Sequence, residues 1–304
     1  MQPTFRDVPR RHLLRAALSA FVALAAGAAF GAPAVRGDPA PEIQTTDWIR
    51  GDGRTTLADF RGQVVYLEFW KTHCGASRGD IRHLVKLAED YGRRGLEVIA
   101  LTGDDDRRGL LRFLAHADAT PTYRIAVGGG SGYAVSTLPY RVLVGADGKL
   151  AADTGNGQSI SDKEIEAALK AVKAPGAEEL EARAARRLAF AEAFAADRLF
   201  LRAEFELQQT VKGFPGTASA RRAAERLKSL GDADAKAELE AQRDVGRLAG
   251  LAPGAETPLE RVRPSEAEAL AKKLAKKADD LRAKTPRAAK LAQDWAEIYA
   301  EPWK

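Results

Sequence analysis

Thiols and imidazoles are scarce in this chain of 304 residues, which has one cysteine and four histidines. A single thiol excludes an intrachain disulfide, a zinc site built from cysteines and an iron–sulfur cluster held by cysteines. The histidines form no HxxxH pair, which predicts that the protein binds no metal. They are His12, His73, His83 and His116. No motif indicates a cofactor, and any thiol chemistry depends on Cys74.

The composition is that of a folded protein, with 45% hydrophobic and 29% charged residues. It excludes collagen-like and disordered classes. The formal net charge is +5, but residues 1–34 contain four arginines and one aspartate, so the remainder carries about +2. This weak positive charge gives no support to nucleic-acid binding, which would need a basic stripe with stacking aromatic residues.

Residues 1–34 are typical of an export signal. Several arginines precede an uncharged, alanine-rich run from Ala16 to Ala34, and Ala32 and Ala34 form an A-x-A cleavage pattern. The pair Arg10-Arg11 also resembles a twin-arginine signal, and an ordinary Sec leader remains the alternative. An uncleaved anchor is a second alternative, because about 19 uncharged residues are enough to span a bilayer. The leader predicts a periplasmic or cell-envelope location.

Residues 39–174 alternate apolar strands with helical stretches, which predicts an α/β domain. The expected strands are 63–70, 97–102, 123–127 and 140–145, and the expected helices are 77–93, 106–117 and 162–172. This alternation predicts parallel strands with helices on both faces of the sheet. Asp52-Gly53 and Asp147-Gly148 predict hairpins, so the sheet is expected to be mixed.

Residues 177–304 carry no strand signals and are rich in alanine, leucine and charge, which predicts an all-α region of amphipathic helices. Breaks are expected at 213–216, 231, 251–254 and 264. The segment 203–227 weakly resembles one tetratricopeptide hairpin, because Pro-Gly separates two helices that carry small residues. These helices predict either a surface for a protein partner or a plain extension packed on the first domain.

Cys74 directly follows the buried strand that ends at Trp70, and it stands where a helix begins. Unpaired N–H groups and the helix dipole at such a position stabilise a thiolate. The pKa of a thiol placed there falls from about 8.5 to as low as about 3.5. Lys71 and a protonated His73 would act in the same direction.

The stretch LADFRGQVVYLEFW at 57–70, followed by Cys74-Gly75-Ala76-Ser77-Arg78, resembles the exported TlpA-like and redoxin branch of the thioredoxin superfamily. The resemblance covers residues 39–173. It implies a thioredoxin-like mixed sheet, with Leu138-Pro139 as the cis-proline loop beside the cysteine.

The resemblance also assigns roles to residues near the cysteine. Trp70, Gly75, Ala76, Leu138 and Pro139 are the expected substrate-binding residues. Glu68 occupies the place of the buried acid of thioredoxins, where burial would raise its pKa and allow it to exchange protons with thiols. The alternative for Glu68 is an edge position with a solvated carboxylate.

The chain departs from the family pattern at Ser77, which replaces the second, resolving cysteine. Cys74 can still attack a disulfide, but another thiol must release the product. Ser77 and His73 are expected to tune Cys74. A one-cysteine peroxidase is a lesser alternative, because its PxxxTxxC signature is absent: Leu67 and Lys71 occupy the proline and threonine positions.

Two classes of function follow from these observations. The first is an exported monothiol oxidoreductase that acts on a disulfide-containing protein or exchanges with a small thiol. The second is a redox-inactive binding protein of the cell envelope that uses the helical region. Retention of Cys74 favours the first class, and loss of the resolving cysteine favours the second.

Overall fold

The computed structural model describes residues 35–104, 106–117, 121–129, 132–154, 159–251 and 262–301. The predicted export signal lies outside the described residues. Within the described residues, no helix is long and apolar enough to cross a membrane.

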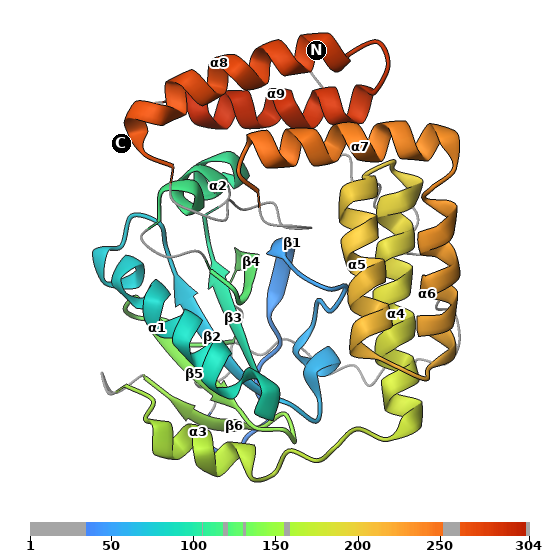
Figure 1. The fold of residues 1–304 in the computed structure, drawn as a ribbon. Coiled ribbons are helices and arrows are strands. Elements are labelled where there is room, and N and C mark those ends of the chain that lie inside the picture. The colour runs from blue at the N-terminus through green and yellow to red at the C-terminus, as the bar shows by residue number, and fades with distance from the viewer. Residues whose placement is uncertain are drawn as a thin grey trace.

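In the part of the chain that the structure describes, six strands form one mixed sheet (Figure 1). They are β1 (Gln44–Arg50), β2 (Val64–Trp70), β3 (Leu96–Thr102), β4 (Arg124–Gly129), β5 (Tyr140–Val144) and β6 (Leu150–Asp153). Their order is β1-β4-β3-β2-β5-β6. The β2–β3 and β3–β4 pairs are parallel, and the other three pairs are antiparallel. The predicted mixed sheet is therefore confirmed, as is the β5–β6 hairpin at Asp147-Gly148.

The hairpin predicted at Asp52-Gly53 is wrong. Strand β1 pairs with β4 at the far edge of the sheet and not with β2. A 3-10 turn, η1 (Leu57–Phe60), lies between β1 and β2. Because this connection crosses the sheet, the Asp-Gly turn marks the end of one strand without pairing it to the next.

Three helices belong to this α/β part: α1 (Gly75–Tyr91), α2 (Arg107–His116) and α3 (Asp162–Leu169), with a short turn η2 (Gly92–Arg94) after α1. The prediction of helices on both faces is wrong, since all three contribute to one buried cluster with the same face of the sheet. Strands β2, β3 and β4 step across the sheet in one direction. Right-handed crossovers in one direction place both connecting helices on one side.

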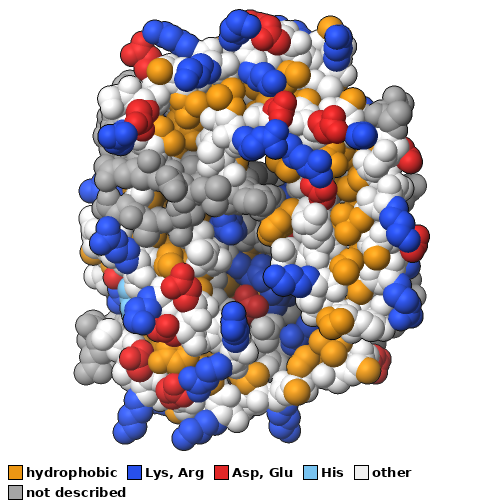
Figure 2. Space-filling model, in the orientation of Figure 1, with side chains coloured by type: hydrophobic (Ala, Val, Ile, Leu, Met, Phe, Trp, Pro, Cys, Tyr) orange, Lys and Arg blue, Asp and Glu red, His pale blue; other side chains and the backbone are white. Residues whose placement is uncertain are grey.

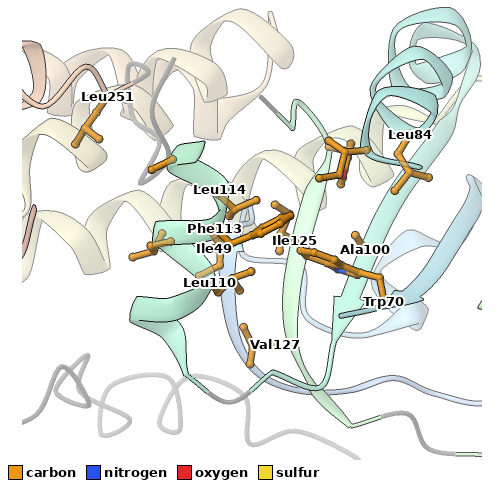
Figure 3. Close-up of a cluster of buried hydrophobic side chains, with 14 of the residues drawn as sticks. Ile49, Trp70, Leu84, Ala100, Leu110, Phe113, Leu114, Ile125, Val127 and Leu251 are labelled. Atoms are coloured by element: carbon orange, nitrogen blue, oxygen red, sulfur yellow. The ribbon is translucent and has the colours of Figure 1, made fainter. Parts of the chain in front are cut away.

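The main core lies between the sheet and these helices. In Figure 3, Phe113 and Leu110 of α2 point toward Ile125 of β4, and Trp70 lies beside them at the end of β2. The rings of Trp70 and Phe113 are 5.7 Å apart between centroids. A second cluster on the opposite face is capped by Leu57 and Phe60 of η1.

The predicted helical region after the sheet is also confirmed. It consists of α4 (Ala177–Ala196), α5 (Phe200–Gly213), α6 (Ala218–Ser229), α7 (Ala233–Leu248), α8 (Pro264–Leu281) and α9 (Pro286–Ala300). Pro264 begins α8, so the predicted break there is a helix start. The sequence reading missed the breaks at Arg198 and Thr285. The likeness of α5 and α6 to a tetratricopeptide hairpin stays a prediction.

The helical region packs on the α/β part at two places. Helices α4, α5 and α6 lie beside the β1 edge of the sheet. Helices α7, α8 and α9 lie across the end of the α/β part at which α2 is located (Figure 1). Trp295 and Tyr299 of α9 belong to the same buried cluster as Phe113. The hydrophobic core is therefore continuous from the sheet into α9.

Candidate active site

Cys74 is the N-cap residue of α1 and is partly exposed. Its carbonyl accepts the first helical hydrogen bond, from the Arg78 N–H at 3.0 Å. Its Sγ atom lies 3.6 Å from the carbonyl oxygen of Leu138. The cysteine predicted at a helix start thus stands there in the structure, next to the loop that the resemblance places beside it.

The environment of Cys74 lowers the pKa of its thiol. The largest cause is the Ser77 hydroxyl as a donor to the sulfur, followed by the Ser77 N–H; burial opposes them, and the Ala76 N–H and the charge of Arg78 add smaller contributions. The Ser77 hydroxyl is buried and has no fixed hydrogen-bond partner of good geometry among the described residues. Its hydrogen is therefore available to a thiolate.

The loop of Leu138 and Pro139 lies against the cysteine. The peptide bond between these two residues is cis, as the resemblance implies. Both side chains are partly buried, whereas Gly75 and Ala76 on the helix side of the cysteine are exposed. The structure therefore brings these four predicted substrate-binding residues to one place, on the two sides of the Cys74 sulfur.

Trp70 differs from the other predicted substrate-binding residues. Its side chain is 4% exposed and packs on Phe113 in the main core. The indole therefore supports the end of β2, from which the cysteine loop starts.

His73 is not among the residues that lower the pKa of Cys74, the role predicted for it. Its side chain is 74% exposed, and its Nδ1 atom is 3.9 Å from Asp104. The side-chain charge that lowers the pKa of Cys74 comes from Arg78. Asp104 also accepts a hydrogen bond from the Thr72 N–H at 2.8 Å, which holds the loop that precedes the cysteine.

Glu68 is buried in the middle of the sheet, so the alternative of a solvated carboxylate is wrong. Its exposed fraction is 1%. Burial raises its pKa to about 7, the negative charge of a Cys74 thiolate raises it too, and Arg141 opposes both effects. A carboxyl with this pKa exchanges protons near neutral pH.

Sequence reasoning missed Arg141, the partner of Glu68. The Arg141 Nε atom is 3.1 Å from Glu68 Oε2, and its guanidinium also binds Asp80 of α1. Glu68 and Arg141 are direct neighbours in the β2–β5 register. The sequence did carry a signal for this pair. Glu68 is the charged residue of the strand VVYLEFW, and Arg141 is the oppositely charged residue of the strand YRVLV.

Comparison with known proteins agrees with this geometry. The model of the AhpC/TSA family matches residues 36–171, which is less than half of the chain. The thiol-disulfide oxidoreductase ResA of Bacillus thuringiensis subsp. konkukian is 32% identical over 116 residues, which cover 38% of this chain and 66% of ResA. Residues 36–171 belong to the redoxin branch of the thioredoxin superfamily.

Further relatives match the same redoxin domain. ResA of Halalkalibacterium halodurans is 26% identical over 98 residues, covering 31% of this chain and 54% of that protein. Among solved structures, a protein assigned as thiol:disulfide interchange protein DsbE from Chlorobium tepidum is 26% identical with a TM-score of 0.38, and the match covers 45% of this chain and 99% of that one. The names of the two ResA relatives agree with the expected class of thiol-disulfide oxidoreductase.

The redoxin domain carries one thiol where a CxxC site would have two, because Ser77 follows three residues after Cys74. Among the described residues, no group of three or more histidine, cysteine or acidic side chains is placed to hold a metal ion. The partly exposed Cys74 thiol with its lowered pKa can act as a nucleophile, with Glu68 and Arg141 nearby.

Proposed function

We propose that the protein is an exported monothiol oxidoreductase that exchanges disulfides through Cys74. The observation that carries this proposal is the position of the thiol: it is partly exposed, caps α1, faces the Leu138–Pro139 loop and has a lowered pKa. Reactive cysteines have such surroundings, whereas structural cysteines are buried and inert.

The proposed reaction has two thiol–disulfide exchanges. The Cys74 thiolate attacks one sulfur of a substrate disulfide, forms a mixed disulfide and releases the other sulfur as a thiolate. A second thiol, either of the substrate or of a small molecule, then ionises and attacks the substrate sulfur of the mixed disulfide. This step releases Cys74 as a thiolate. The substrate ends with a new disulfide to that second thiol, so that the chain itself is neither oxidised nor reduced over the cycle.

The surrounding residues have separate tasks in this proposal. Ser77 donates a hydrogen bond to the thiolate, and Glu68 takes the proton when the Cys74 thiol ionises and returns it to a leaving thiolate. Gly75, Ala76, Leu138 and Pro139 contact the substrate on the two sides of the Cys74 sulfur. Trp70 supports the cysteine loop from the core. His73, next to Cys74, is exposed and available to an incoming substrate.

The proposal is tested by the pH dependence of alkylation of Cys74, followed by intact mass, with denatured protein as the reference. We expect a midpoint well below about 8.5, the value for an ordinary cysteine. The variant Ser77→Ala should shift the midpoint upward, because it removes the largest cause of the lowered pKa. Ser136→Ala, at an exposed position in the loop that leads to Leu138, is the matched control and should leave the midpoint unchanged.

Oxidised glutathione then tests the exchange itself. The wild-type protein should gain one glutathione and lose it when a free thiol is added, and Cys74→Ser should gain none. A folded protein with a midpoint at or above about 8.5 that takes up no glutathione would contradict the proposal. That outcome would favour the second candidate, a binding protein of the cell envelope, and conversion of Cys74 by peroxide alone would favour a peroxidase.

A further inference from the structure

Arg141 is shared between two carboxylates that belong to different elements. Its Nε atom donates a hydrogen bond to Glu68 Oε2 of β2 at 3.1 Å, and its Nη2 atom donates one to Asp80 Oδ2 of α1. The N–H groups on Nε and Nη2 form one fork of the guanidinium, which can bind both oxygens of a single carboxylate. Here the two donors bind different residues, so Glu68 receives only half of a bidentate pair.

The three side chains of this Arg141 cluster differ in their access to water. Glu68 is 1% exposed, Arg141 17% and Asp80 23%. Elsewhere, as Figure 2 shows for one face of the molecule, many Lys, Arg, Asp and Glu side chains stand at the surface, where water screens their charges. Screening is weak at the buried Glu68, so the position of the guanidinium has a large effect on it.

The backbone fixes where the side chain of Arg141 can reach. The Arg141 N–H donates a hydrogen bond to the Thr154 hydroxyl at 2.8 Å, and the Arg141 carbonyl accepts one from the Thr154 N–H at 3.0 Å. Arg141 lies two residues after Pro139. Asp80 lies six residues after Cys74, which is about 9 Å along α1. Arg141 therefore joins the cis-proline loop to the helix that the thiol caps.

Few other groups near Glu68 carry charge at neutral pH. The other titratable side chains that interact with it are Cys74, Tyr66 and Tyr123. Burial raises the pKa of both tyrosines far above neutral pH, so they are uncharged there. On the β3 side, the neighbour of Glu68 is the uncharged Ala100. The charge of Glu68 therefore depends on Arg141 and on the Cys74 thiolate, with Asp80 acting through Arg141.

We propose that Asp80 is a positioning residue of the site: by holding Nη2 of Arg141, it prevents a bidentate pair with Glu68 and keeps that carboxyl able to bind a proton. The inference rests on the proposed function, in which Glu68 takes the proton of the Cys74 thiol and returns it to a leaving thiolate. A carboxylate bound by both donors would be a weaker proton acceptor near neutral pH. The negative charge of Asp80 acts in the same direction, because it opposes ionisation of Glu68.

NMR of the glutamate carboxyl carbons measures the protonation of Glu68 directly. The full chain carries Cys74→Ser, which removes the thiolate, and the Glu68 signal is identified by its loss in Glu68→Gln. We expect Asp80→Ala to lower the titration midpoint of Glu68 by at least about one pH unit, because both donors of Arg141 then reach Glu68. Asp80→Asn removes the charge but keeps an oxygen that accepts from Nη2, so its shift should be smaller.

The matched control is Asp90→Ala, which removes an exposed carboxylate from the same helix, where it pairs with Lys86. This variant should leave the midpoint of Glu68 unchanged. An unchanged midpoint in Asp80→Ala would overturn the inference. Equal shifts in the Ala and Asn variants would also overturn it, because the charge of Asp80 and not its hold on the guanidinium would then act on Glu68.

The pH profile of glutathione uptake by the chain with its thiol connects this inference to the proposed reaction. We expect the rate to change around the midpoint of Glu68, and Asp80→Ala should move that change to lower pH, whereas Asp90→Ala should not. A profile that stays in place while the NMR midpoint falls would overturn the role of Asp80 in exchange. Absence of uptake together with a lowered NMR midpoint would contradict the proposed function alone, since Asp80 would still be shown to control Glu68.

Discussion

Glu68 and Arg141 are the charged residues of two strands that are otherwise apolar, and they pair with each other across the sheet. Burial keeps this carboxyl partly protonated near neutral pH, because its effect outweighs that of Arg141 and raises the pKa of Glu68 to about 7. A buried carboxyl of this kind costs stability when it ionises and supplies a proton acceptor in return.

The pH dependence of stability should show this cost. The pKa of Glu68 is about 7 in the folded state and about 4.5 in the unfolded chain, so unfolded protein ionises first as the pH rises. The contribution of the neutral carboxyl is present below pH 4.5 and is lost as the pH rises through 7. Relative to Glu68→Gln, the wild type should lose up to about 3 kcal/mol between about pH 4.5 and about pH 8.

Urea unfolding of both proteins at about pH 5 and about pH 8 measures this difference. Gln is the right replacement, since its amide oxygen still accepts a hydrogen bond from Arg141. Glu225→Gln, an exposed position on α6, is the control and should track the wild type at both pH values. If the difference between wild type and Glu68→Gln is the same at both pH values, the raised pKa of Glu68 is contradicted.

At the scale of elements, α2 connects the sheet to the C-terminal helices. Its Phe113 packs on Trp70 at the end of β2, and the same cluster contains Trp295 of α9. The helix is ten residues long and begins at Arg107, after the N-cap Asp106, whose side chain accepts a hydrogen bond from the Arg108 N–H. A short helix of this kind owes its stability to packing more than to helix propensity.

Phe113→Ala should therefore reduce the free energy of unfolding by about 3 to 5 kcal/mol, because it removes a buried ring and leaves a cavity between α2 and the sheet. Chemical denaturation of the full chain measures the loss. Val135→Ala, at a side chain that is 36% exposed, is the matched control and should cost less than about 1 kcal/mol. Equal losses in the two variants would show that α2 does not depend on this contact.

At the scale of the whole molecule, the buried cluster crosses the boundary predicted between residues 39–174 and 177–304. Arg112 of α2 also forms an ion pair with Glu301, beyond the end of α9. The division into two domains is still our proposal, and the continuous core predicts that the two parts stabilise each other. Separation would expose the face of α2 that carries Arg108 and Arg112, which pair with Glu297 and Glu301.

A fragment of residues 35–175 tests this coupling. We expect it to keep the sheet and the lowered pKa of Cys74, since those contacts lie within it, but to melt about 10 °C lower than the full chain. Circular dichroism on heating and alkylation of Cys74 are the measurements. An unfolded fragment would contradict the boundary, and an unchanged melting temperature would contradict the coupling.

The sequence by itself determined the local features of this protein. The buried strand and the helix start at Cys74 follow from adjacent residues, whereas the serine in place of a second thiol and the cis-proline loop follow from the resemblance of this sequence to a family pattern. Apolar runs and helical periodicity depend on nearby residues, so the bounds of the strands and helices that they mark could be predicted to within a few positions.

Tertiary structure decided which distant residues meet. The pairing of β1 with β4, the placement of α1, α2 and α3 on one face, and the partnership of Glu68 with Arg141 depend on strand order. A cleft between the end of β1, the beginnings of β3 and β4, and helices α4 and α5 likewise brings together residues from 50 to 205, which lie far apart in the chain. Local patterns do not specify such contacts, because many strand orders bury the same apolar faces.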